Sequence, residues 1–96
     1  MTRNLDRQYR QSTSGLYRRT IAGVTALHRE SWDAPLVLNP ALQLVWTCLE
    51  IGGSVEDIAD DIVNVFGNDA GEARSDVEDA FRQLHDLALI EPVDVG

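Results

Sequence analysis

The sequence predicts a single α+β domain in which three helices cover one side of a small three-stranded antiparallel sheet. Residues 16–38 are rich in β-branched and aromatic side chains interrupted by turn formers, a pattern typical of short strands. From residue 39 onward three amphipathic stripes follow, each with a helix-start signal. A chain of 96 residues, of which 44% are hydrophobic, can bury one core but not two. Strands followed by helices around one core define the α+β class.

Three strands are expected, at residues 16–20, 24–29 and 34–38, joined by tight connections at Gly23 and at residues 30–33. The preceding residues 1–14 are polar, with Leu5 and Tyr9 as the larger apolar or aromatic side chains after Met1. Because this segment has little apolar surface to bury, it is expected to be a flexible arm. The packed domain is then expected to span residues 15–92.

The first helix is expected over residues 40–51. Asn39 can cap the free amides of its first turn, and Pro40 at the first helical position has no amide to leave unpaired. One buried face is indicated by apolar residues at the i, i+3, i+4, i+7 spacing, namely Leu42, Val45, Trp46 and Leu49. Gly52 and Gly53 are expected to stop this helix.

Two further helices follow. The second begins after Ser54, whose Ser-Val-Glu-Asp sequence is similar to a capping box, and it is expected to end at Gly67. The third is expected to begin at Ser75, which forms an S-x-x-E box with Glu78, and to end near Leu87. Residues 89–90 are expected to be extended.

The distribution of charge disfavours nucleic acid as a partner. Six of the eight arginines lie in the first thirty residues, whereas residues 31–96 carry fourteen carboxylates and keep only Arg74 and Arg82. That acidic region would repel a phosphate backbone.

The chain is expected to be cytoplasmic. Its only cysteine is Cys48, so a disulfide framework is not indicated, and no secretory leader is recognised. No apolar stretch approaches the roughly 20 residues that a membrane-spanning helix needs.

Catalytic chemistry is not indicated by the residues present. Cys48 lies in the middle of an apolar helix, where a buried thiol is expected rather than a nucleophile. His28 on a strand and His85 on a helix are far apart in sequence, and neither belongs to a metal-ligand pattern. We therefore expect no enzyme activity, no cofactor and no metal.

A resemblance to the PqqD family is carried by the run Leu38-Asn39-Pro40-Ala41-Leu42 with Val45-Trp46, followed after Gly52-Gly53 by Ser54-Val55-Glu56-Asp57-Ile58-Ala59. In that family an L-N-x-x-A-x-x-I-W-like segment, a small turn and a [ST]-V-x-x-I helix come in this order. The C-terminal part is also similar, with Asp76-Val77, Phe81, Leu84 and Leu89-Ile90. Ala88 stands where the family often has glycine.

The resemblance implies a non-catalytic, winged-helix-like domain that recognises the leader of a ribosomally synthesised, post-translationally modified peptide. The leader would bind as an added strand between the third strand and the third helix. The chain is also similar to the stand-alone leader-binding subunits of lasso-peptide clusters. Such subunits present a precursor to a separate protease or other peptide-modifying enzyme.

Sheet-edge physics independently favours the same mechanism, because the unpaired N–H and C=O groups of an edge strand can be satisfied by an extended peptide. The predicted acceptor is the last strand, which is uncharged and lacks the lysines that usually protect an edge: Ala34, Pro35, Leu36, Val37 and Leu38. Side-chain specificity is expected from helix three, with candidate peptide-binding residues Val77, Ala80, Phe81, Leu84 and His85. For Phe81 and Leu84 a role in the core is equally open.

Two other functions remain open from the sequence. A winged-helix DNA-binding regulator would use the third helix for recognition, although its acidic residues argue against this. A small protein-interaction subunit would share the physics of a binding module without needing a linear peptide. Trp32, just before the third strand, fits either a surface binding role or a packed turn.

Overall fold

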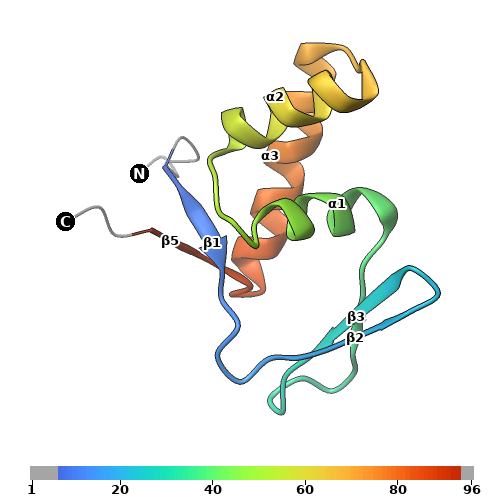
Figure 1. Cartoon of the computed structure of the whole chain (residues 1–96). Helices are drawn as coiled ribbons and strands as arrows, with labels where there is room; N and C mark the ends of the chain where they lie inside the picture. Colours follow the sequence, from blue (N-terminus) through green and yellow to red (C-terminus); the bar gives the residue numbers. More distant parts are fainter. Residues whose placement is uncertain (1–6, 94–96) are drawn as a thin grey trace.

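A computed structural model of the chain describes residues 7–93. It confirms the α+β class: a hairpin and a third short strand precede three helices, and one further strand lies at each end (Figure 1). The elements are β1 Tyr9–Gln11, β2 Tyr17–Ile21, β3 Val24–His28, β4 Leu36–Val37, α1 Pro40–Cys48, α2 Val55–Phe66, α3 Ala70–Asp86 and β5 Ile90–Pro92.

The hairpin matches the predicted strands 16–20 and 24–29 to within one residue. β2 and β3 pair antiparallel from Tyr17 opposite His28 to Ile21 opposite Val24. Their two-residue turn has φ of 52° at Ala22 and 80° at Gly23, the left-handed conformations that a type I′ hairpin turn requires.

The third strand is shorter than the predicted range 34–38, because only Leu36 and Val37 pair with β3 as β4. Pro35 would turn its backbone away from β3, as Val37 does, so its missing amide lies on the open side of the strand and not in the β3–β4 ladder. On the other side the Leu38 amide still donates to the Thr25 carbonyl at 2.9 Å, but Asn39 then caps α1.

Both caps predicted for the first two helices are present. The Leu42 amide donates to Asn39 Oδ1 at 2.8 Å, with Pro40 in the first turn. At the start of α2, Ser54 and Asp57 form a reciprocal capping box. Helix α1 ends at Cys48 rather than at residue 51.

The predicted start of the third helix at Ser75 is wrong, since α3 begins at Ala70. Asp69 is the cap, and its Oδ2 accepts a hydrogen bond from the Glu72 amide at 3.0 Å. The additional turn is stabilised by packing, because Ala73 is buried. Burial of Ala73 therefore outweighs the local S-x-x-E signal at Ser75, which lies inside the helix and not at its start.

The structure corrects the expected flexible arm for residues 9–11, which form β1 and pair antiparallel with β5. Tyr9 is 4% exposed, and its backbone exchanges two hydrogen bonds with Gly53, of 2.8 and 2.9 Å. The packed unit therefore begins before residue 15. Residues 1–6 of the predicted arm lie outside the described part of the chain.

One core joins the strands to the helices, which lie on one side of the three-stranded sheet (Figure 1). Thr25 and Leu27 of β3 point into this core, while their neighbours along the strand face outward. The largest fully buried side chains come from β3, all three helices and the segments that connect them: Trp46, Phe81, Leu27, Leu49, Ile58, Leu84, Leu89, Val55 and Val77.

Candidate functional site

Strand β4 lies at the edge of its sheet. The strand order is β2-β3-β4, so within residues 7–93 β4 pairs with β3 on one side and its other side is open. An open strand side presents backbone N–H and C=O groups in the spacing that another extended chain needs. The position predicted for the acceptor strand is therefore an edge in the folded protein.

The register shows which backbone groups face the open side. The Leu38 amide donates to the Thr25 carbonyl, and Leu36 lies opposite Leu27 two residues further along the ladder. Because successive residues of a strand turn their N–H and C=O groups to opposite sides, those of Val37 face away from β3. Val37 thus supplies one donor and one acceptor at the open edge.

The side chains of the predicted acceptor segment divide between the core and solvent. Leu38 is buried and Leu36 is half-buried, so both point toward the helices. Val37 points to the opposite face and is 61% exposed. Ala34 and Pro35 precede the strand and are exposed.

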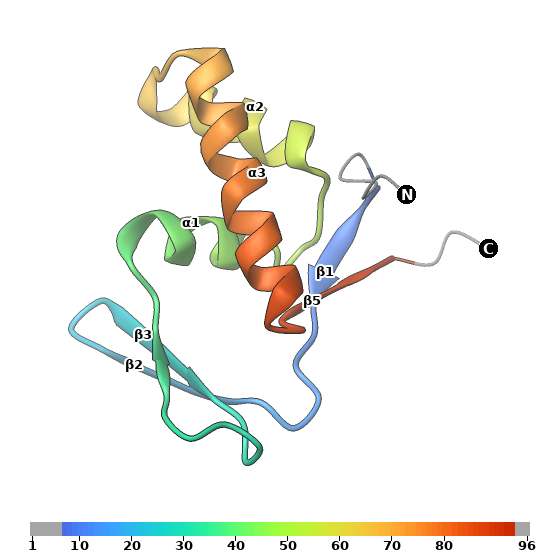
Figure 2. The same ribbon diagram turned by 180° about the vertical axis from the view of Figure 1, so that it is seen from behind.

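Four of the predicted groove residues on α3 lie in the core. Val77, Phe81 and Leu84 are completely buried, and Ala80 is 4% exposed. Figure 2 shows α3 between β1 on one side and α1 with the β3–β4 segment on the other. A peptide at the β4 edge would therefore meet the flank of α3 rather than its buried stripe.

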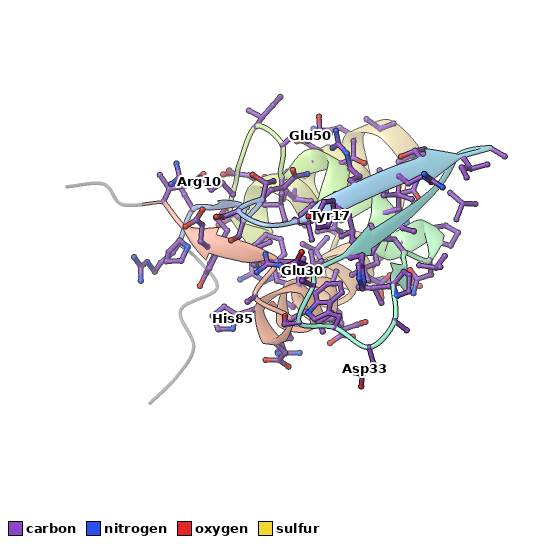
Figure 3. The ribbon with its side chains drawn as sticks, turned by 90° about the horizontal axis from the view of Figure 1, so that it is seen from below. Arg10, Tyr17, Glu30, Asp33, Glu50 and His85 are labelled. Atoms are coloured by element: carbon purple, nitrogen blue, oxygen red, sulfur yellow. The ribbon has the colours of Figure 1, made fainter. Side chains whose placement is uncertain are left out.

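His85 is exposed, but it lies on the β1 flank of α3. Its ring meets the ring of Tyr9 edge to face, with centroids 6.4 Å apart. In Figure 3 it lies beside the β1–β5 ribbon, away from Asp33 in the β3–β4 connection. His85 therefore lies beside Phe81 on the Tyr9 side of α3 and away from the β3–β4 connection that leads into the predicted acceptor strand.

The opposite flank of α3 carries a row that the sequence did not single out. Asp76, Gln83 and Leu87 share this flank with Ala80 at spacings of three and four residues. Asp76 lines a hollow together with Ala41 and Leu44 of α1, so this flank of α3 faces α1. Leu87, 38% exposed at the end of α3, is its largest apolar member. The available signal in the sequence was the position of Leu87, three residues after Leu84 at the end of the apolar stripe.

Trp32 closes the connection between β3 and β4. It is half-buried against the core, and its ring meets that of His28 edge to face with centroids 6.4 Å apart. Its amide donates to the Arg29 carbonyl at 2.9 Å, which closes a turn. The packed-turn interpretation of Trp32 is therefore correct, although part of the ring remains accessible.

The cysteine of α1, Cys48, has a pKa above that of an ordinary thiol. Burial raises the pKa of the Cys48 thiol, and the negative charge of Asp61 raises it further. A thiol with a raised pKa is a weaker nucleophile near neutral pH. Within residues 7–93, no three His, Cys, Asp or Glu side chains are grouped as metal ligands.

The arginines of α3 are engaged by carboxylates of the same helix. Arg74 Nε lies 3.1 Å from Glu78 Oε1, and Arg82 Nη1 lies 2.9 Å from Asp79 Oδ1. A recognition helix needs cations that are available for phosphates. These ion pairs weaken the DNA-binding alternative. No helix in the described region is long and apolar enough to cross a membrane.

Comparison with known proteins identifies the family. Residues 27–90 match the model of the family described as coenzyme PQQ synthesis protein D (PqqD), so the chain belongs to the PqqD family. This match confirms the resemblance carried by the sequence motifs.

A solved structure described as TbiB1 in complex with the TbiA(beta) leader peptide shares the fold. It superimposes with a TM-score of 0.72 at 22% sequence identity, and the match covers 88% of this chain and 98% of that one. No curated protein matches the sequence significantly.

Proposed function

We propose that this protein binds the leader segment of a ribosomally synthesised precursor peptide as an added strand on β4 and delivers it to modifying enzymes. The observation that carries the proposal is the backbone of Val37, whose N–H and C=O face the open edge of the sheet. Membership of the PqqD family and the fold shared with TbiB1, a protein solved with a leader peptide, support it.

An added strand would pair its backbone with Val37 and alternate its side chains between the two faces of the sheet. Those on the helix side would pass between Leu36 and the flank of α3 that carries Gln83 and Leu87. Backbone pairing provides affinity that is independent of sequence, whereas these side-chain contacts provide specificity. Among the residues predicted from sequence, Phe81 and Leu84 would support the groove from beneath.

The protein acts in this proposal without catalysing a reaction. It raises the local concentration of precursor at a partner protease or other peptide-modifying enzyme, in the cytoplasm where the precursor is made. Its presence should lower the apparent KM of that enzyme for leader-bearing substrate.

The strand-addition mechanism can be tested on the peptide itself. The probe is a fluorescein-labelled synthetic leader of the precursor encoded beside this protein, with single backbone nitrogens methylated in turn. Methylation at amides that face β4 should weaken binding about 10-fold, since each removes a hydrogen bond and adds a methyl group at the edge. Methylation at the alternating amides should leave the affinity nearly unchanged.

A profile without this two-residue period would contradict strand addition. In a parallel reaction, the unlabelled precursor is incubated with the purified protein alone and followed by mass spectrometry. Its mass should stay constant until the partner enzyme is added. A change of mass without the enzyme would contradict the non-catalytic role.

A further inference from the structure

The outer face of the three-stranded sheet is a second exposed surface, separate from the helices. We define the outer sheet face by the residues whose side chains alternate with the buried Thr25 and Leu27 and by their cross-strand partners: Tyr17, Arg19, Ile21, Val24, Ala26, His28 and Val37. Figure 3 views the molecule from this side, with β2 and β3 in front of the helices and Tyr17 on β2.

This face concentrates exposed apolar groups. Tyr17, Ile21, Val24 and Val37 are 60%, 64%, 49% and 61% exposed, and they make up half of the eight large hydrophobic side chains that are exposed within residues 7–93. Antiparallel sheets that face water usually alternate apolar and polar residues. An apolar outer face on so small a sheet is therefore the mark of an interaction surface.

The face is also hollowed at its centre. Ala26 lies between Arg19 of β2 and Val37 of β4 in the same cross-strand row, and its small side chain leaves a depression. Tyr17, His28 and Pro35 border this depression, which has a volume of about 410 Å³. A single large apolar or aromatic side chain from a partner would fit there.

Arg19 adds a charge to this apolar surface. Within residues 7–93 it has no carboxylate partner, whereas its neighbour Arg18 forms an ion pair with Glu50 at 3.3 Å on the opposite side of the strand. A cation surrounded by apolar groups selects a partner that brings a carboxylate. It can also lie against an aromatic side chain seated over Ala26.

A second copy of the chain, paired through the same face, would not supply the carboxylate that Arg19 requires. If the outer sheet face paired with itself, two Arg19 side chains would enter one interface, and the face has no carboxylate to neutralise them. Each copy also carries a formal charge of −8, so their net charges repel.

The surface is continuous with the proposed leader site. Val37 belongs to both, because its side chain lies on the outer sheet face while its backbone faces the open edge. A bound leader strand would extend the sheet and place alternate side chains beside Val37. A protein seated on the outer sheet face would therefore contact the module and the leader together.

We propose that the outer sheet face docks the enzyme that receives the precursor, through an apolar or aromatic anchor seated over Ala26 and a carboxylate opposite Arg19. This inference rests on the proposed leader binding and adds the surface through which the delivery occurs. The partner is thus a protein with an apolar, acid-bearing patch that recognises the module and the bound leader as one surface.

The test uses the full chain and the purified peptide-modifying enzyme encoded beside it. Ala26→Leu fills the depression from its exposed side, and Arg19→Glu reverses the charge. Each should weaken binding of the enzyme about 10-fold or more, the effect of losing one anchor, while the affinity for the labelled leader stays within about 2-fold. Ala70→Leu and Arg7→Glu, at exposed positions away from the sheet, are the matched controls and should bind the enzyme normally.

Circular dichroism establishes that each variant is folded, and biolayer interferometry with and without leader measures docking. Unchanged enzyme binding in both outer-face variants would overturn the proposal. Parallel loss of leader binding would overturn it too, since the face would then belong to the leader site. If the wild type is a dimer and Ala26→Leu dissociates it, the outer sheet face binds a second copy of the chain and not the enzyme, which would also overturn the proposal. If the wild type binds the enzyme but no leader, docking stands and the proposed function fails.

Discussion

The ring of Tyr9 meets the ring of Phe81 edge to face, with centroids 5.7 Å apart and an angle of 87° between their planes. This contact joins a strand near the N-terminus to the middle of α3. The backbone of Tyr9 is fixed at the same time by Gly53, across a turn in which Gly52 has φ of 103°. A Cβ on Gly52 would lie 3.1 Å from the Tyr9 carbonyl oxygen, so the close approach favours glycine there.

Tyr9→Ala should therefore lower the free energy of unfolding by about 3 kcal/mol, as expected for deletion of a buried aromatic side chain. Tyr17→Ala is the matched control, because that ring is 60% exposed, and it should cost less than about 1 kcal/mol. Urea denaturation monitored by circular dichroism measures both. Equal, small effects would show that β1 is not part of the folded unit in solution.

Phe81 and Leu87 should separate stability from binding. Phe81→Ala should lower the free energy of unfolding by about 3–5 kcal/mol, because the side chain is completely buried. Leu87→Ala should leave stability within about 1 kcal/mol and lower leader affinity by about 1 kcal/mol or more, since this partly exposed side chain lies on the flank of α3 along which the proposed groove runs. Normal leader binding by Leu87→Ala would place the specificity contacts elsewhere.

The part of the fold that sequence could predict is the part whose signals are local. Asn39, Ser54 and the Ala22-Gly23 turn act within three or four residues of their own position, and each has the predicted structure. Strand β1 has no such signal, because its partners are Gly53 and Pro92, far away along the chain. A single tyrosine in a polar segment does not reveal these pairings.

The candidate site was predictable to a similar extent. The edge position of β4 follows from the order of the strands, which the sequence indicated. The amphipathic stripe of α3 predicts which residues face inward, but not which flank of the helix lies beside β4. That distinction depends on the crossing of α3 with β1 and α1, which places His85 against Tyr9 and leaves Leu87 on the other side.

Ala88 has a backbone conformation that favours glycine. It follows α3 with φ of 57°, the left-handed conformation that costs an L-residue with a Cβ roughly 1 kcal/mol. Ala88→Gly should therefore raise the free energy of unfolding by up to about 1 kcal/mol, partly offset by the greater freedom of glycine in the unfolded chain. A loss of stability in urea denaturation would contradict this account.

Asp57 makes stability depend on pH. The hydrogen bond from Gln8 Nε2, at 2.9 Å, and then the bonds with Ser54 hold the pKa of Asp57 below its ordinary value. A carboxyl group with a lowered pKa in the folded state contributes stability above its ordinary pKa, and this contribution disappears as pH falls through the lowered value. Asp57→Asn should therefore destabilise the protein most near neutral pH.

The difference in unfolding free energy between the wild type and Asp57→Asn should shrink as the pH falls below the ordinary pKa of an aspartate and through the lowered pKa of Asp57 in the folded state. Urea titrations across this range measure it. Asp60→Asn, at an exposed position on the same helix, is the control for the substitution itself. A difference that grows on acidification would contradict the sign of this linkage.

The two residues of β4 should respond in opposite ways to proline. At Leu36 the amide faces β3, so Leu36→Pro removes a ladder hydrogen bond and should destabilise the fold by about 3 kcal/mol. At Val37 the amide faces the open edge, so Val37→Pro should leave the circular dichroism spectrum and melting temperature close to the wild type. Its affinity for the labelled leader should fall about 10-fold or more, because proline removes the donor and places its ring at the edge. Val37→Ala keeps the amide and should bind the leader normally, which separates the backbone from the side chain. A folded Val37→Pro variant with wild-type affinity would show that the leader does not pair with β4.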